Sequence, residues 1–255
     1  GILRNGIWAY TNERLCKDDL ITVQIVENEC SDNISPVNLP LDIAYEDDDI
    51  IVINKPFDMP AHPSAGNHDN TLANALMYYY GSQNKPFVYR CINRLDRDTT
   101  GLTIVAKHAL AGGILGNAVA KRAIHRTYYA VCSGCTPAYM RISAPIARKD
   151  ASTIERCVDF KRGENAVTDF IRIKYNPDNN LSLVKLRLLT GRTHQIRVHM
   201  KYIGFPLIGD FLYNPDYTYI SRQALHSGRL VFTHPVTGQK MNLISDIPSD
   251  MKSLF

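Results

Sequence analysis

Asn93-Arg94-Leu95-Asp96-Arg97-Asp98-Thr99-Thr100-Gly101-Leu102 is the stretch from which the fold and the chemistry can be read. It places the carboxylate of Asp96 between two arginines, directly ahead of an apolar run at 102–106 that predicts a buried strand. Flanking guanidinium groups keep a carboxylate ionised. Such a group can act as a nucleophile or stabilise positive charge at a sugar carbon. Composition alone favours the simpler interpretation, a surface turn whose ion pairs contribute little stability.

A second polar stretch, at 191–200, follows the strand pattern at 181–189. Its spacing predicts a helix that is capped by Thr193 and ended by Gly204, with Arg197 in the first turns. A partly buried arginine in that place needs an acidic partner, and we expect it to face Asp96. The spacing of the two histidines in this stretch and the absence of an H-E-x-x-H motif disfavour a metal site.

Two further segments add candidate contacts. Tyr128 and Tyr129 lie in a strand-like run at 127–132, so their side chains should point to opposite faces, one into a pocket and one into the core. A pocket tyrosine offers a flat face to a nucleobase and a hydroxyl for proton transfer. Lys55 and His62 begin and end a proline-rich loop after the strand run at 50–53, which suits a binding loop.

The charge distribution is more informative than the net charge of +4. Residues 90–126 contain seven basic and two acidic residues, and residues 185–201 contain five basic residues and no acid. The two basic islands could form one face for a polyanion, or they could be ordinary solvated surface.

Composition and periodicity predict an α+β protein with a mixed, mainly antiparallel sheet, since strand patterns outnumber helical ones and the two do not alternate strictly. No apolar run approaches the ~18 residues of a membrane span. The six cysteines include a lone C-x-x-C pair, Cys132 and Cys135, which lacks the further ligands of a zinc site. We therefore expect a cytoplasmic protein that carries no metal and uses no nucleotide cofactor.

Together these segments resemble the RluA-type family of pseudouridine synthases, from about residue 41 to the C-terminus. The motifs that carry the resemblance are Arg94-Leu95-Asp96, Thr100-Gly101-Leu102, Gly191-Arg192-Thr193-His194-Gln195-Ile196-Arg197-Val198-His199, Leu207-Ile208-Gly209-Asp210 with Tyr213, Leu225-His226 and Thr233-His234-Pro235. The resemblance implies isomerisation of uridine in RNA without a cofactor.

The resemblance also implies a role for each matching residue. Asp96 matches the catalytic aspartate, Tyr128 the tyrosine that stacks on the target uracil, and Arg197 the basic partner of the aspartate. The residues expected to contact RNA are Arg94, Lys55, His62, Arg192 and His194.

Residues 1–30 are similar to the tail of an S-four-like RNA-binding domain, residues 31–40 read as a linker, and residues 41–255 as the catalytic domain. The resemblance implies RNA as the partner, with ribosomal RNA preferred over transfer RNA. We expect the protein to act as a monomer and not to bind a membrane. Two alternatives remain from the residues alone. A non-catalytic RNA-binding module would keep the basic islands, and a retaining glycosidase would need a second carboxylate about 5–5.5 Å from the first, for which Asp98 is the nearest candidate.

Overall fold

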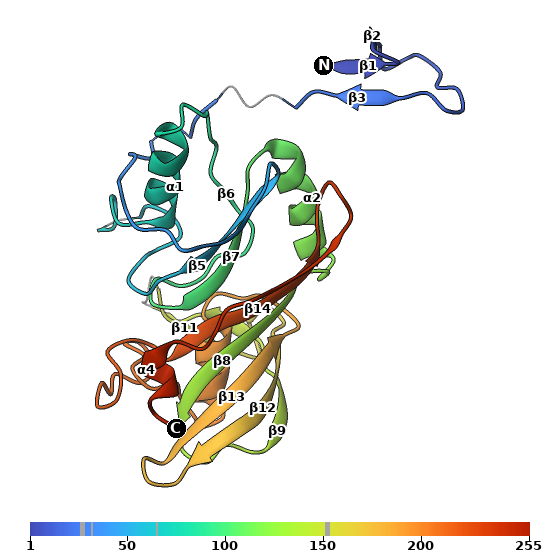
Figure 1. The fold of residues 1–255 in the computed structure, drawn as a ribbon. Helices are drawn as coiled ribbons and strands as arrows, with labels where there is room; N and C mark the ends of the chain where they lie inside the picture. The colour runs from blue at the N-terminus through green and yellow to red at the C-terminus, as the bar shows by residue number, and fades with distance from the viewer. Residues whose placement is uncertain (26–28, 32, 65, 151–153) are drawn as a thin grey trace.

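The computed structural model describes residues 1–25, 29–31, 33–64, 66–150 and 154–255. Its centre is one ten-stranded sheet in the order β4-β5-β7-β14-β8-β13-β12-β9, with β15 beside β14 and β6 beside β7 (Figure 1). These strands are β4 Ile43–Glu46, β5 Ile50–Lys55, β6 Arg90–Cys91, β7 Thr100–Ala106, β8 His125–Ser133, β9 Tyr139–Ser143, β12 Val167–Asn176, β13 Leu181–Leu188, β14 Leu225–Thr233 and β15 Lys240–Ile244. The predicted α+β class with a mixed, mainly antiparallel sheet is confirmed.

One pair of neighbours in this sheet, β7 and β14, runs parallel. There Gly101 lies opposite Ser227 with a φ of +106°, and a Cβ atom on residue 101 would lie 2.3 Å from the carbonyl oxygen of Ser227. Only glycine fits this close approach. The motif glycine therefore allows β14 to insert between β7 and β8, which brings the start of β7 near Tyr128.

The helices are α1 Leu72–Gly81, α2 Ala109–Ala120, α3 Gln195–Tyr202 and α4 Ser249–Lys252. Because side chains alternate along a strand, β5 buries Ile50 and Val52 with α2 and buries Ile51 and Ile53 with α1 on the other face. Strand β8 divides in the same way, with Tyr128 packed in the α3 layer and Tyr129 in the α4 layer. The prediction that the two tyrosines point apart is confirmed.

The start of α3 differs from the prediction. The N-cap residue is His194, in the left-handed region at φ 56°, and no side chain caps the helix there, so Thr193 is not the cap. The turn is closed instead by Gln195, whose Oε1 accepts hydrogen bonds from the backbone N–H of Arg192 at 2.9 Å and from Thr190 Oγ1 at 2.8 Å. Gly204, at φ 84°, follows the end of the helix as expected.

Two small sheets lie apart from the central one. Strands β1 Ile2–Arg4, β2 Ile7–Trp8 and β3 Ile21–Val23 form an antiparallel sheet near the N-terminus, and β10 Ile146–Arg148 pairs with β11 Arg156–Val158. Of the predicted linker, Ile34 and Leu39 pack against the core cluster around α1. Among the described residues, no helix is both long and apolar enough to cross a membrane.

Candidate active site

The loop from β6 to β7 carries Asp96, and the side chain of Asn93 holds its base. Asn93 is 2% exposed; its Oδ1 accepts from the backbone N–H of Ile104 at 2.8 Å and its Nδ2 donates to the carbonyl of Leu102 at 3.2 Å. At the tip, the backbone N–H of Thr99 donates to the carbonyl of Asp96 at 3.1 Å. These bonds fix the loop against β7, so the Asp96 carboxylate has a defined position.

Arg197 is the partner of Asp96. Its Nη1 donates to Asp96 Oδ2 at 2.9 Å, while Nε and Nη2 bind the two oxygens of Asp210, each at 2.7 Å. The arginine side chain is 1% exposed and that of Asp210 is fully buried, whereas that of Asp96 is 29% exposed. Burial alone would lower the pKa of Arg197, but the hydrogen bonds of Asp210 and the charge of Asp96 raise it. The arginine therefore remains a cation and presents one N–H to a solvent-accessible carboxylate.

Aromatic rings enclose the guanidinium. Its carbon lies 5.1 Å from the ring centroid of Tyr213 and 5.3 Å from that of Phe211, which is cation–π geometry. The Tyr213 hydroxyl accepts from the backbone N–H of Arg156 at 2.9 Å and lies 3.0 Å from His194 Nδ1. This pattern favours donation from the hydroxyl to Nδ1, which leaves the proton of a neutral imidazole on Nε2, 4.0 Å from Asp96 Oδ2. Burial also lowers the pKa of His194, which favours that neutral form.

Tyr128 lies in the same cavity as Asp96. It is 5% exposed, on the strand that neighbours β14, and burial raises the pKa of its hydroxyl. The phenol is therefore protonated at neutral pH and offers a ring face and a donor rather than a charge.

The cavity that contains both residues is a groove of about 960 Å³. Asp96 is the one acidic residue among the described residues that line it. Seven arginines share the lining: Arg94, Arg97, Arg122, Arg126, Arg187, Arg192 and Arg197. These arginines come from both basic islands of the sequence, so the islands meet in one groove with a single carboxylate inside it.

Four of the five residues expected to contact RNA line this groove, namely His62, Arg94, Arg192 and His194. Lys55 does not: it is 1% exposed, and its Nζ donates to the carbonyls of Pro56 at 2.7 Å and Arg97 at 2.8 Å. Its expected contact with RNA is therefore wrong for this conformation, because the ammonium is enclosed and already bonded. Burial lowers the pKa of Lys55 to about 7.

Several residues that line or support the groove were not among the site residues expected from the sequence. Arg122, Arg126 and Arg187 lie in the groove, and only their place in the basic islands indicated them. Asp210 ends the motif Leu207-Ile208-Gly209-Asp210, but nothing in its spacing predicts that it binds Arg197.

Among the described residues that line the groove, none supplies the second carboxylate of a glycosidase. Asp98 is 8% exposed and is bound by its neighbour Arg97, Nε to Oδ1 and Nη2 to Oδ2, each at 3.0 Å, and it does not line the groove. The glycosidase alternative therefore lacks its second catalytic group.

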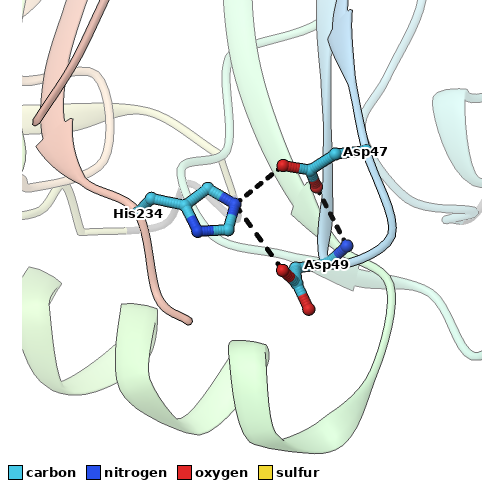
Figure 2. A group of neighbouring side chains, drawn as sticks. All are labelled: Asp47, Asp49 and His234. Atoms are coloured by element: carbon cyan, nitrogen blue, oxygen red, sulfur yellow. Dashed lines mark hydrogen bonds and ion pairs between the residues drawn. The ribbon is translucent and has the colours of Figure 1, made fainter. Parts of the chain in front are cut away.

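Among the described residues, one cluster has the composition of a metal site: Asp47, Asp49 and His234 (Figure 2). His234 Nε2 lies 2.8 Å from Asp47 Oδ2 and 3.8 Å from Asp49 Oδ2. The backbone N–H groups of Val236 and Thr237 both donate to His234 Nδ1, at 3.3 and 3.1 Å. A neutral ring with Nδ1 as acceptor carries its proton on Nε2, where a metal would need a lone pair. The cluster is arranged as a hydrogen-bonded tie between the β4–β5 turn and the β14–β15 turn, not as a ligand set.

The C-x-x-C pair is not a site either. Cys132 is fully buried in the layer below α3, whereas Cys135 is exposed, and its Sγ accepts from Arg172 Nη1 at 2.7 Å.

The described lining of the groove presents one carboxylate among seven arginines, which is the arrangement expected of a site that receives a polyanion. The family model of RNA pseudouridylate synthase matches residues 49–202. The chain is 41% identical over 253 residues to the uncharacterized RNA pseudouridine synthase YjbO of Bacillus subtilis, covering 98% of this chain and 88% of that protein. It is also 41% identical to ribosomal large subunit pseudouridine synthase D of Haemophilus influenzae, covering 99% of this chain and 81% of that protein.

A solved structure agrees with these relatives. Human RNA pseudouridylate synthase domain containing 1 superposes with a TM-score of 0.68 at 26% identity, covering 81% of this chain and 83% of that one. The chain belongs to the RNA pseudouridylate synthase family, whose members are isomerases that act on uridine in RNA.

Proposed function

We propose that this protein converts uridine to pseudouridine in ribosomal RNA, with Asp96 as the catalytic carboxylate, Arg197 as its cationic partner and Tyr128 as the residue that holds the base. One observation supports this most strongly. The only carboxylate among the described residues of an arginine-lined groove is held at 2.9 Å by a buried arginine and shares the cavity with a buried tyrosine.

The reaction breaks the bond between the sugar C1′ and the uracil N1 and forms a bond between C1′ and C5. Asp96 either adds to C1′ or helps to remove a sugar proton on the way to a glycal, and in both routes it must be ionised. Arg197 donates an N–H to the Asp96 carboxylate, and Asp210 keeps the arginine in place. C5 loses its proton once the new bond has formed and N1, freed from the sugar, takes up a proton, so atoms balance without a cofactor.

Tyr128 keeps the detached uracil in the groove. The ring is buried and presents an apolar face, and its hydroxyl can move a proton near C5. Retention of the base favours rejoining at C5 over loss to solvent.

The arginines supply the binding free energy that this chemistry needs. A uridine within structured RNA must first leave its stack, at a cost of a few kcal/mol. Phosphate contacts from Arg94 and Arg192, together with the arginines of the groove walls, can offset that cost. His62 and His194 line the same groove and are available to the flipped nucleotide.

Ribosomal RNA is proposed as the substrate because several relatives at about 40% identity carry the name ribosomal large subunit pseudouridine synthase D. The catalytic and RNA-contacting groups all lie on one chain, so we also propose that the monomer is the active form and that it works in the cytoplasm, where ribosomal RNA is located. The three-stranded sheet near the N-terminus is proposed as the tail of an S-four-like RNA-binding domain.

The test is release of tritium from RNA labelled at uracil C5. Ribosomal RNA from a strain that lacks this gene should release label with the wild-type protein and none with Asp96→Asn. Tight binding without release would favour the non-catalytic RNA-binding module. Release of tritium from transfer RNA but not from ribosomal RNA would support the proposed reaction and refute ribosomal RNA as the substrate.

A further inference from the structure

A second cavity opens beside the groove. It has a volume of about 490 Å³ and lies between the β10–β11 hairpin and the loop ahead of α3. Its described lining contains four arginines and one acid: Arg148, Arg156, Arg162, Arg192 and Glu164. The two cavities share the wall formed by residues 191–193. A bound RNA strand that leaves the groove on this side would therefore reach the second cavity next.

Two of these arginines face each other across the hairpin. Arg148 on β10 and Arg156 on β11 are directly opposed in the antiparallel register, so their side chains leave the same face of the hairpin. Like charges in this relationship destabilise a hairpin, and an anion between them removes the repulsion. We therefore expect a bound phosphate to be favoured between Arg148 and Arg156, where Arg156 Nη1 now donates to the carbonyls of Ile154 and Glu155 at 3.3 and 3.2 Å.

The other two arginines already bind carboxylates. Arg192 Nη1 binds Glu164, and Arg162 binds Asp150 at 2.6 Å and Asp159 at 2.8 Å. The side chains of Glu164 and Asp150 are 70% and 79% exposed, so these ion pairs contribute little stability and exchange readily. The carboxylate of Glu164 occupies the guanidinium edge that a phosphate oxygen would take.

The hairpin is also connected to the catalytic centre. The backbone N–H of Arg156 donates to the Tyr213 hydroxyl, which bonds His194, and His194 lies beside Asp96. An anion held by Arg156 would thus order the strand that positions Tyr213 and His194.

We propose that this cavity binds a backbone phosphate of the substrate RNA, at a nucleotide outside the segment that enters the groove. Arg148 and Arg156 hold the phosphate, and Glu164 leaves Arg192 when it binds. The proposal rests on the proposed function, because it assumes that the groove holds RNA.

The experiment compares two RNAs, a stem-loop that extends beyond the groove on both sides and an oligonucleotide of a few nucleotides around the target uridine. The double variant Arg148→Gln/Arg156→Gln should bind the stem-loop roughly 10-fold more weakly or worse, the loss expected for charge-assisted hydrogen bonds. Its salt slope for the stem-loop should fall by about one. Turnover of the short RNA at saturation should be unchanged. Glu164→Gln should tighten stem-loop binding.

Arg141→Gln is the matched control. Arg141 is an exposed arginine on β9 bound to Asp169, outside both cavities, and its loss should leave both RNAs unaffected. If the double variant binds the stem-loop as the wild type does, the proposal is overturned. An effect on inorganic phosphate binding alone would assign the cavity to the free ion and also overturn it. Failure of the wild type to turn over either RNA would instead refute the proposed function.

Discussion

Arg197 binds Asp210 through two parallel hydrogen bonds of 2.7 Å, and both side chains are buried. This bidentate pair fixes the plane of the guanidinium and directs the remaining Nη1 at Asp96, 2.9 Å away. Asp210 does not line the groove. We therefore expect it to act on the reaction as a positioning residue, through Arg197 and through the turn to Tyr213, whose backbone N–H donates to Asp210 Oδ1 at 3.2 Å.

Asp210→Asn should lower the free energy of unfolding by about 3 kcal/mol, because it leaves a buried guanidinium with only the partial compensation of Asp96. Turnover should fall as well, since Arg197 loses its orientation. Urea denaturation measures the first effect and tritium release the second. The control is Asp169→Asn, which removes the more exposed pair with Arg141 and should cost about 0–1 kcal/mol. Equal costs for the two variants would contradict the assignment.

Asp96→Asn should abolish turnover and leave the fold intact. The asparagine oxygen can still accept from Arg197, which also retains Asp210, so the free energy of unfolding should change by no more than about 1 kcal/mol. Only the negative charge is lost. Circular dichroism and urea denaturation check the fold, and turnover near the wild-type rate would exclude Asp96 as the catalytic group.

The extent to which the sequence predicts this site follows from the range of the interactions. Strand alternation predicted the apolar runs and the opposite directions of Tyr128 and Tyr129, and the local charge pattern marked Asp96 as a candidate. The choice of Asp96 and Tyr128 as site residues came from the resemblance to the family. The partner of Arg197 was not predictable, because Asp210 reaches it through a loop that no periodicity describes. Lys55 was assigned to RNA because it stands at the head of a proline-rich loop that suits binding, whereas its Nζ is buried and donates to two backbone carbonyls. The N-cap of α3 is His194 in a left-handed conformation and not Thr193, and the residue preferences at N-cap positions do not predict this.

Tyr128→Phe should slow turnover by about 100- to 10,000-fold, the usual contribution of a positioned proton-transfer group, while RNA affinity stays near the wild-type value. The ring remains available to the base, and only the hydroxyl is removed. Tyr129→Phe, on the opposite face of the same strand, is the matched control and should retain activity. The measurements are single-turnover rates and filter binding. A parallel loss in both variants would indicate a structural effect of the strand.

RNA affinity should fall steeply with salt, because the arginines of the groove displace counterions from RNA. For a protein with 6–10 phosphate contacts, the loss between 50 and 200 mM salt is about 10³–10⁵-fold on duplex DNA, and we expect the same direction with a shallower slope here. Arg122 and Arg187 line the groove but were not among the expected site residues. Arg122→Gln and Arg187→Gln should each lower the slope of log affinity against log salt by about one. A flat dependence would refute the groove as the phosphate-binding surface.

Stability should fall as the pH is lowered from about 6.5 to about 4, and His226 should be a main cause. This side chain is 1% exposed, and burial lowers its pKa from 6.5 to about 4. Between these values the unfolded chain binds a proton at His226 that the folded protein does not, so acid favours unfolding. The difference corresponds to about 3 kcal/mol at the acidic end.

His226→Gln can keep the bonds to Thr100 and Ser245 with its amide, and it should flatten the dependence of the unfolding free energy on pH. His68→Gln, at an exposed position, should not. Stability that stays constant over this window in the wild type would show that His226 accepts its proton without cost in the folded protein.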